Sequence, residues 1–139
     1  MRGTVHHIDL SVTDPEASFA LYDAVLRFLG YELYHRAANG IEWNLVTDTG
    51  THSVGLAPSR GDNADRPHDR YSPGFHHLAW WADSREDVDR CHALLQDIGA
   101  DILDAPAEYP QYNKGRGYYA VFFADRDGLK LEVAWTAAG

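Results

Sequence analysis

Apolar and polar residues alternate at two places in the chain in a way that predicts half-buried strands. Residues 7–12 read His-Ile-Asp-Leu-Ser-Val, and residues 77–82 read His-Leu-Ala-Trp-Trp-Ala. A period of two sends successive side chains to opposite faces of a sheet. We therefore predict two equivalent strands, each with one face packed against a helix.

Each predicted strand is followed by the signals of an amphipathic helix. Asp14 and the Asp83-Ser84 pair supply N-cap chemistry, and apolar residues then recur at three- and four-residue spacing over residues 17–29 and 84–98. Asp14 precedes the terminating Gly30 by as many residues as Asp83 precedes Gly99. The matching order and spacing indicate an internal repeat.

Three strand-like runs follow each helix, and they complete the repeat. They are residues 31–36, 41–47 and 52–57 in the first half, and 100–103, 118–124 and 130–135 in the second. Residues 104–117 are predicted as a long loop. The predicted fold is α+β: two tandem βαβββ modules form one curved, cup-shaped mixed sheet with helices on the outside. A single domain, 1–139, comprises module 1 (about 1–57), a linker (58–74) and module 2 (about 75–139).

Composition narrows the classes of function and location. The 139 residues carry 12 Lys and Arg against 21 Asp and Glu, a formal net charge of −9. This acidity argues against nucleic-acid or membrane partners, because both need clustered positive charge. The lone cysteine, Cys91, cannot form an intramolecular disulfide, and the first residues lack an apolar leader. We therefore expect a cytoplasmic protein in which Cys91 is a small core residue.

Histidine is the unusual component, with eight copies of which four form two doublets. Strand parity places His7, His77 and, on the last strand, Glu132 on the face away from the helices. Two imidazoles and a carboxylate suit a divalent ion such as Fe, Mn, Zn or Ni. Taken singly, each doublet could instead be a polar strand end and Glu132 a solvated edge residue. His6 and His76 fall on the opposite face and are interpreted as packing residues or as partners that orient the ligands.

The same residues carry a family resemblance. Three segments resemble the vicinal oxygen chelate superfamily of glyoxalases, extradiol dioxygenases and bleomycin-resistance proteins. They are the run from His7 to Asp14, the segment Gly74-Phe75-His76-His77-Leu78-Ala79, and the ending Asp125-Arg126-Asp127-Gly128-Leu129-Lys130-Leu131-Glu132-Val133. The resemblance implies that His7, His77 and Glu132 are metal ligands. It also implies a fourth ligand near Gly55 in glyoxalase-like members, where this chain has no carboxylate. We therefore expect a three-ligand site.

The resemblance implies a small-molecule substrate that chelates the metal through two adjacent oxygens. The reaction would be lyase or isomerase chemistry, extradiol cleavage or thiol transfer, with Glu132 also taking part in catalysis. One alternative is a non-catalytic protein that binds an antibiotic or metabolite in the same cup. Another is a degenerate module whose site is a relic. Exposed sheet edges make a homodimer plausible.

Further candidates come from aromatic and cationic residues near the predicted cup. Trp81 and Trp43 are candidate cavity walls, although core packing is the alternative for each. In the loop 108–117, Tyr112, Lys114 and Arg116 could close on an anionic substrate as a lid, or form a solvated surface loop. Either Tyr118 or Tyr119 could donate a hydrogen bond or act as general acid. We favour Tyr119, because Val121 and Phe123 at alternate positions could line the cup.

Overall fold

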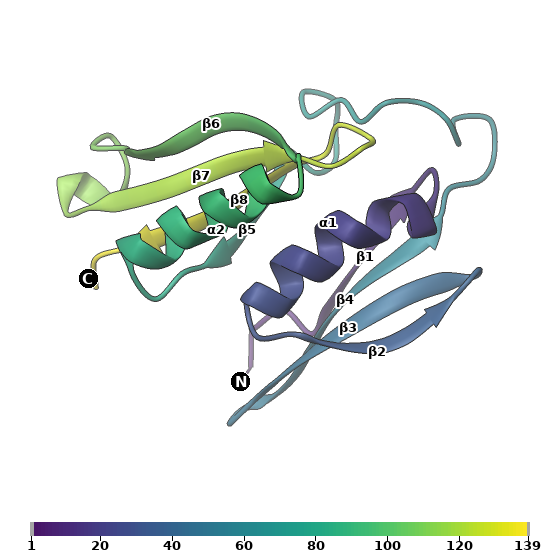
Figure 1. Ribbon diagram of the computed structural model, residues 1–139, viewed down its shortest axis with the longest axis horizontal. Helices are drawn as coiled ribbons and strands as arrows, with labels where there is room; N and C mark the ends of the chain where they lie inside the picture. The colour runs from purple at the N-terminus through teal and green to yellow at the C-terminus, as the bar shows by residue number, and fades with distance from the viewer. Residues whose placement is uncertain (1, 139) are drawn as a thin grey trace. The chain divides into compact units, whose positions relative to one another are not determined.

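A computed structural model describes residues 2–138 and divides the chain into two compact units, Met1–Arg66 and Pro67–Gly139 (Figure 1). The division falls inside the predicted linker. Each unit has the element order βαβββ, so the predicted tandem repeat is confirmed. Strand pairing gives two four-stranded sheets, one per unit, where one continuous sheet was expected.

Unit 1 is built from one helix and four strands. The strand order is β1-β4-β3-β2, with β1 and β4 parallel and the other pairs antiparallel. Asp14 caps the helix as predicted, because its side chain accepts a hydrogen bond from the amide of Ala17 at 3.2 Å. The elements are β1 (His7–Val12), α1 (Pro15–Phe28), β2 (Glu32–Ala37), β3 (Gly40–Thr47) and β4 (Gly50–Pro58).

Unit 2 repeats this plan with the order β5-β8-β7-β6. Of the two predicted cap residues, Ser84 is the N-cap, and its hydroxyl accepts from the amide of Asp87 at 3.1 Å. The elements are β5 (His77–Trp81), α2 (Arg85–Asp97), β6 (Asp101–Glu108), a 3-10 turn (Asn113–Gly115), β7 (Tyr118–Ala124) and β8 (Lys130–Thr136).

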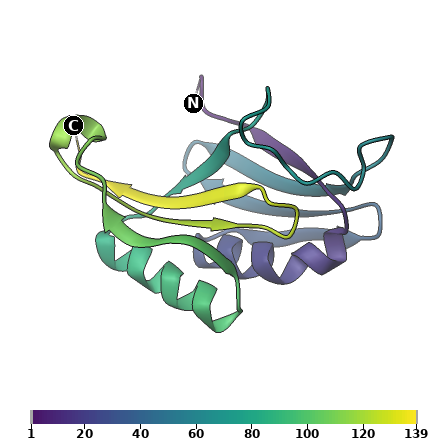
Figure 2. The same ribbon diagram turned by 90° about the horizontal axis from the view of Figure 1, so that it is seen from above.

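The core of each unit lies between its helix and one face of its own sheet (Figure 2). On β1, Leu10 and Val12 are buried while His7, Asp9 and Ser11 are exposed, which confirms the predicted parity. The fully buried residues of unit 2 include Val88, Cys91 and Leu95 of α2 and Val121, Phe123, Leu131 and Val133 of the strands.

One element boundary differs by more than two residues from the sequence prediction. Residues 104–108, expected in a loop, continue strand β6 as far as Glu108. The strand was missed because Asp104 and Pro106 interrupt its pattern, and its pairing with β7 shifts register between Ile102 and Asp104 and again before Ala107. Proline is tolerated here because β6 is an edge strand. Among residues 2–138, none of the helices has the length and hydropathy needed to span a membrane.

Candidate functional site

A histidine and a buried carboxylate meet in unit 2, on the sheet face opposite α2. His77 opens β5, and Glu132 lies on the adjacent parallel strand β8, where its register partner is Ala79. His77 Nε2 stands 2.9 Å from Glu132 Oε2. The Glu132 side chain is only 1% exposed. Burying a carboxylate is costly unless its oxygens have polar partners, so the contact with His77 stabilises Glu132 in this position.

Tyr118 supplies the second partner of that carboxylate. Its hydroxyl donates to Glu132 Oε1 at 2.5 Å, so each oxygen of Glu132 has one partner. Burial first, and then the hydrogen bond to Glu132, raise the pKa of Tyr118 well above its usual range. Tyr118 therefore keeps its proton at neutral pH and serves as a hydrogen-bond donor.

Aromatic rings surround the carboxylate and its tyrosine. Phe122 lies with its ring centroid 6.3 Å from that of His77 and 5.4 Å from that of Tyr109. Tyr112 packs against Tyr118 at 5.2 Å. Rings of this kind exclude water and lower the local dielectric constant, which strengthens the interactions of any charge held there.

His77, Glu132, Tyr118 and the rings around them are called the carboxylate cluster below. An apolar pocket of about 240 Å³ lies beside this cluster, within unit 2. Trp81 forms part of its wall and is 75% exposed, which leaves an indole surface open to a ligand. Tyr118 belongs both to the pocket and to the carboxylate cluster. The pocket is lined by Ala79, Trp80, Trp81, Tyr118, Ala134 and Thr136, none of which carries a charge at neutral pH.

Unit 1 has a histidine and carboxylate pair of its own. His7 and Asp9 project from the same face of β1, and His7 Nε2 lies 3.7 Å from Asp9 Oδ2. Both side chains are more than half exposed. Asp9 was missed in the sequence analysis, although its position two residues after His7 on a strand could have revealed it.

The two histidine doublets share one geometry. The Nδ1 atoms of His6 and His7 are 2.8 Å apart, as are those of His76 and His77. The rings stand at 84° in the first doublet and 75° in the second. Each doublet therefore uses its Nδ1 atoms internally and directs the Nε2 of His7 or His77 toward a carboxylate.

These donors fit a divalent metal ion. A His nitrogen and a carboxylate oxygen bound to one ion at about 2.0–2.2 Å would stand about 3 to 3.5 Å apart. The separations of 3.7 Å for His7 and Asp9 and 2.9 Å for His77 and Glu132 lie within about 0.2 Å of this range. Within residues 2–138 no three His, Cys, Asp or Glu side chains form a ligand group, so each unit by itself offers a pair.

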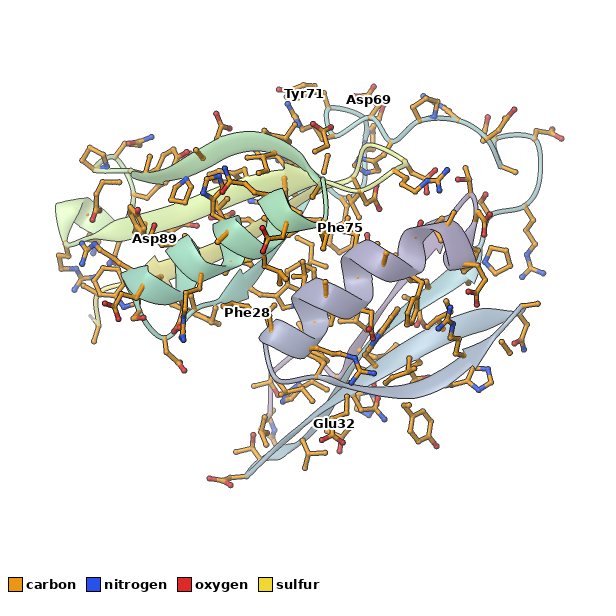
Figure 3. The ribbon with its side chains drawn as sticks, viewed as in Figure 1. Phe28, Glu32, Asp69, Tyr71, Phe75 and Asp89 are labelled. Carbon is orange, nitrogen blue, oxygen red and sulfur yellow. The ribbon has the colours of Figure 1, made fainter. Side chains whose placement is uncertain are left out.

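The structure corrects the choice between the two tyrosines. Tyr119 points toward α2, where its hydroxyl donates to Asp89 Oδ1 at 2.7 Å; Asp89 is labelled in Figure 3. Val121 and Phe123, expected to line the cup, are fully buried in the helix-side core. Tyr118 is the tyrosine on the face of Glu132.

Trp43 also differs from the expectation that it lines a cavity. It is fully buried in unit 1, stacks on Phe19 of α1 at 5.8 Å, and donates its indole N–H to Asp23 at 2.9 Å. This is the placement of a core residue, and it leaves Trp43 no open surface for a ligand.

The loop after β6 is held by its own contacts. Asn113 donates to the carbonyl oxygens of Gly117 and Ala137 at 2.9 and 3.2 Å. Arg116 bonds to the Asn113 side-chain oxygen at 3.2 Å, and Lys114 is exposed with a left-handed backbone at φ 53°. Of the three predicted loop residues, Tyr112 is thus the one in contact with the carboxylate cluster, through Tyr118.

Comparison with known proteins places the chain in a family. Residues 4–133 match the model of the Glyoxalase/Bleomycin resistance protein/Dioxygenase superfamily. An uncharacterized protein of Bacillus subtilis, YqjT, is 31% identical over 93% of this chain and 96% of its own. A putative glyoxalase from Bacillus halodurans shares 29% identity over 96% of both chains, with a TM-score of 0.77.

A more distant neighbour shares the fold. The lactoylglutathione lyase of Agrobacterium tumefaciens is 19% identical over 96% of this chain and 93% of its own, with a TM-score of 0.64. The family model spans nearly the whole chain, so its match includes parts of both βαβββ units. This chain belongs to the glyoxalase/bleomycin resistance protein/dioxygenase superfamily.

Proposed function

We propose that this protein is a metal-dependent enzyme in which His7, His77 and Glu132 hold a divalent ion. The observation that carries the proposal is the buried Glu132 carboxylate, held between the Tyr118 hydroxyl and His77 Nε2. The Glu132 side chain is only 1% exposed. A buried negative charge lowers the stability of the fold unless a cation or hydrogen-bond donors stabilise it. A cation at His77 and Glu132 would compensate that charge.

The proposed substrate is a small molecule with two adjacent oxygens and an apolar remainder. A bound divalent ion would act as Lewis acid toward those oxygens. Tyr118 orients Glu132 and holds its own proton, because burial and Glu132 raise its pKa. Trp81 and the other uncharged residues of the pocket would take the apolar part of the substrate and exclude water from it.

Lyase or isomerase chemistry and extradiol-type oxygenation are the two reaction classes in this proposal. The superfamily contains both kinds of enzyme, and one structural neighbour is named a lactoylglutathione lyase. The metal would discriminate between them, since iron favours oxygen chemistry and zinc or nickel favours isomerisation.

The experiment that tests the proposal is elemental analysis of protein purified without added metal. We expect near-stoichiometric divalent ion in the wild type and its loss in His77→Ala and Glu132→Gln. His35→Ala on β2 and Glu86→Gln on α2 are matched controls from exposed positions and should retain the ion. A wild type that carries no ion and binds none on titration would reject the metal-dependent function.

The second candidate function is ligand binding without catalysis. The open indole of Trp81 beside an apolar pocket favours it, because such a surface binds planar ligands without any metal. Quenching of tryptophan fluorescence by panels of catechols and α-hydroxyketones, with and without a chelator, separates the two functions. Binding that is unchanged by the chelator supports the binding protein.

A further inference from the structure

Each unit has one carboxylate at the same position in the register of its parallel strand pair, but the two carboxylates lie on non-equivalent strands. In unit 2 the parallel pair of β5 and β8 sets Ala79 opposite Glu132. In unit 1 the equivalent pair of β1 and β4 sets Asp9 opposite Gly55. The carboxylate therefore stands on the last strand of unit 2 and on the first strand of unit 1, with a small residue facing it in both cases.

Gly55 leaves the space into which the Asp9 side chain extends. A Cβ built on Gly55 would lie 2.4 Å from Asp9 Oδ1, far inside the contact limit. The backbone of Gly55 lies outside the left-handed region, so its conformation does not require glycine. The close approach of the Asp9 carboxylate is the feature that a side chain at this position would disturb.

The orientation of His7 indicates what Asp9 would contact. His7 Nδ1 is occupied by His6 at 2.8 Å, which leaves Nε2 as the nitrogen available to an ion. A carboxylate that only oriented the ring would face the nitrogen that does not bind metal. Asp9 instead faces Nε2, as Glu132 faces Nε2 of His77. Asp9 is thus on the side of His7 where a metal would bind.

We propose that Asp9 is a fourth protein ligand, which supplies from β1 the carboxylate that β4 lacks at Gly55. The inference rests on the proposed metal site and extends it from three ligands to four. The four ligands would leave fewer open coordination positions for substrate than a three-ligand site.

The test measures binding of Co²⁺ alone, by calorimetry and by its visible absorption spectrum. We expect Asp9→Asn to weaken binding roughly 10- to 100-fold and to change the spectrum, because one charged oxygen donor is lost. Asp48→Asn, an equal change of charge in the exposed β3–β4 turn of the same unit, is the control and should have no effect.

Gly55→Ala tests the same contact without altering a ligand. Its Cβ displaces the Asp9 carboxylate, which is 70% exposed and free to move toward solvent, so the fold should be preserved. We expect a loss of Co²⁺ affinity similar to that of Asp9→Asn, and no additional loss in the double variant. Thermal unfolding of the metal-free proteins checks that each variant is folded.

Moving the carboxylate back to β4 completes the experiment. Asp9→Ala combined with Gly55→Glu should bind Co²⁺ more tightly than Asp9→Ala alone. If Glu132→Gln abolishes binding while Asp9→Asn and Gly55→Ala bind as the wild type does, Asp9 is not a ligand and the three-ligand site stands. If Glu132→Gln itself has no effect, the proposed metal site fails, and the role of Asp9 fails with it.

Discussion

The carboxylate that faces a histidine is buried in unit 2, whereas the one in unit 1 is exposed to solvent. Glu132 is 1% exposed and has a hydroxyl and an imidazole as partners, while Asp9 is 70% exposed and lies 3.7 Å from its histidine. The strand pairs that carry them are equivalent in register. The comparison shows that one backbone plan supports two different electrostatic environments, because Glu132 lies on an inner strand beside aromatic rings and Asp9 lies on the edge strand β1.

The aromatic residues themselves are distributed differently between the units. Unit 1 buries its tryptophan, Trp43, beneath α1, whereas unit 2 leaves Trp81 exposed beside the pocket. In unit 2, rings also cover the face opposite the helix, with Phe122, Tyr109 and Tyr118 packed together. Unit 2 therefore has packed side chains on both faces of its sheet. We expect ligand contacts on the face opposite α2.

Replacing the two tryptophans should give the largest contrast between the units. Trp43→Ala removes a fully buried ring and should lower the free energy of unfolding by about 3–5 kcal/mol. Trp81→Ala removes an exposed ring and should change it by about 0.5 kcal/mol or less. Urea denaturation followed by circular dichroism measures both. Equal losses would show that Trp81 is as much a core residue as Trp43.

Removing single hydroxyl groups from the tyrosine pair should have the next largest effect. Tyr118→Phe leaves Glu132 Oε1 without its donor in a buried site, which should cost about 1–3 kcal/mol of stability. Tyr119→Phe removes an exposed hydrogen bond to Asp89 and should cost about 0.5 kcal/mol or less. The same denaturation measurement tests this pair. A larger loss for Tyr119→Phe would contradict the partner assignment of Glu132.

The helix caps should behave alike in the two units. Asp14→Ala and Ser84→Ala each remove a side-chain acceptor from a helix amide and should each lower stability by about 1 kcal/mol. Thermal unfolding of the two variants checks this equivalence. Asp48→Asn, which lies in a turn and caps no helix, is the control and should leave the melting temperature unchanged.

An effect that is absent at neutral pH should appear at alkaline pH, at Cys91 of α2. Burial raises the pKa of this thiol from 9.0 to about 12. The unfolded chain then loses the thiol proton first, so the associated stability is complete below pH 9 and is lost as pH rises toward 12. Between pH 8 and 11, stability should fall more steeply in the wild type than in Cys91→Ala. Parallel slopes would contradict the buried thiol.

Most of the fold could be predicted from the sequence because its signals are local. Alternation on β1, the cap at Asp14 and the glycine that follows each helix depend on neighbouring residues alone. The prediction was wrong at β6, where Pro106 and two register shifts hide an edge strand. The strand is formed by pairing with β7, a long-range interaction that local propensity does not describe.

The site was less predictable than the fold. Residues 118–124 are uniformly apolar or aromatic, so no alternation indicates which tyrosine shares a face with Glu132. The pairing of Phe122 with Glu132 fixes that face and selects Tyr118. Trp43 was ambiguous for a related reason, since a large aromatic residue suits both a core and a cavity wall.

The sequence by itself determined the repeated βαβββ order, the family motifs and the parity that sets His7 and Asp9 on one face of β1 and His77 on the corresponding face of β5. Only the tertiary structure decided that Glu132 is buried, that Tyr118 is its donor and that Asp9 extends over Gly55. The physical reason is the distance along the sequence over which each signal acts. Periodicity fixes the direction of a side chain along its own strand, whereas burial and hydrogen bonding depend on which strands pair and in what register.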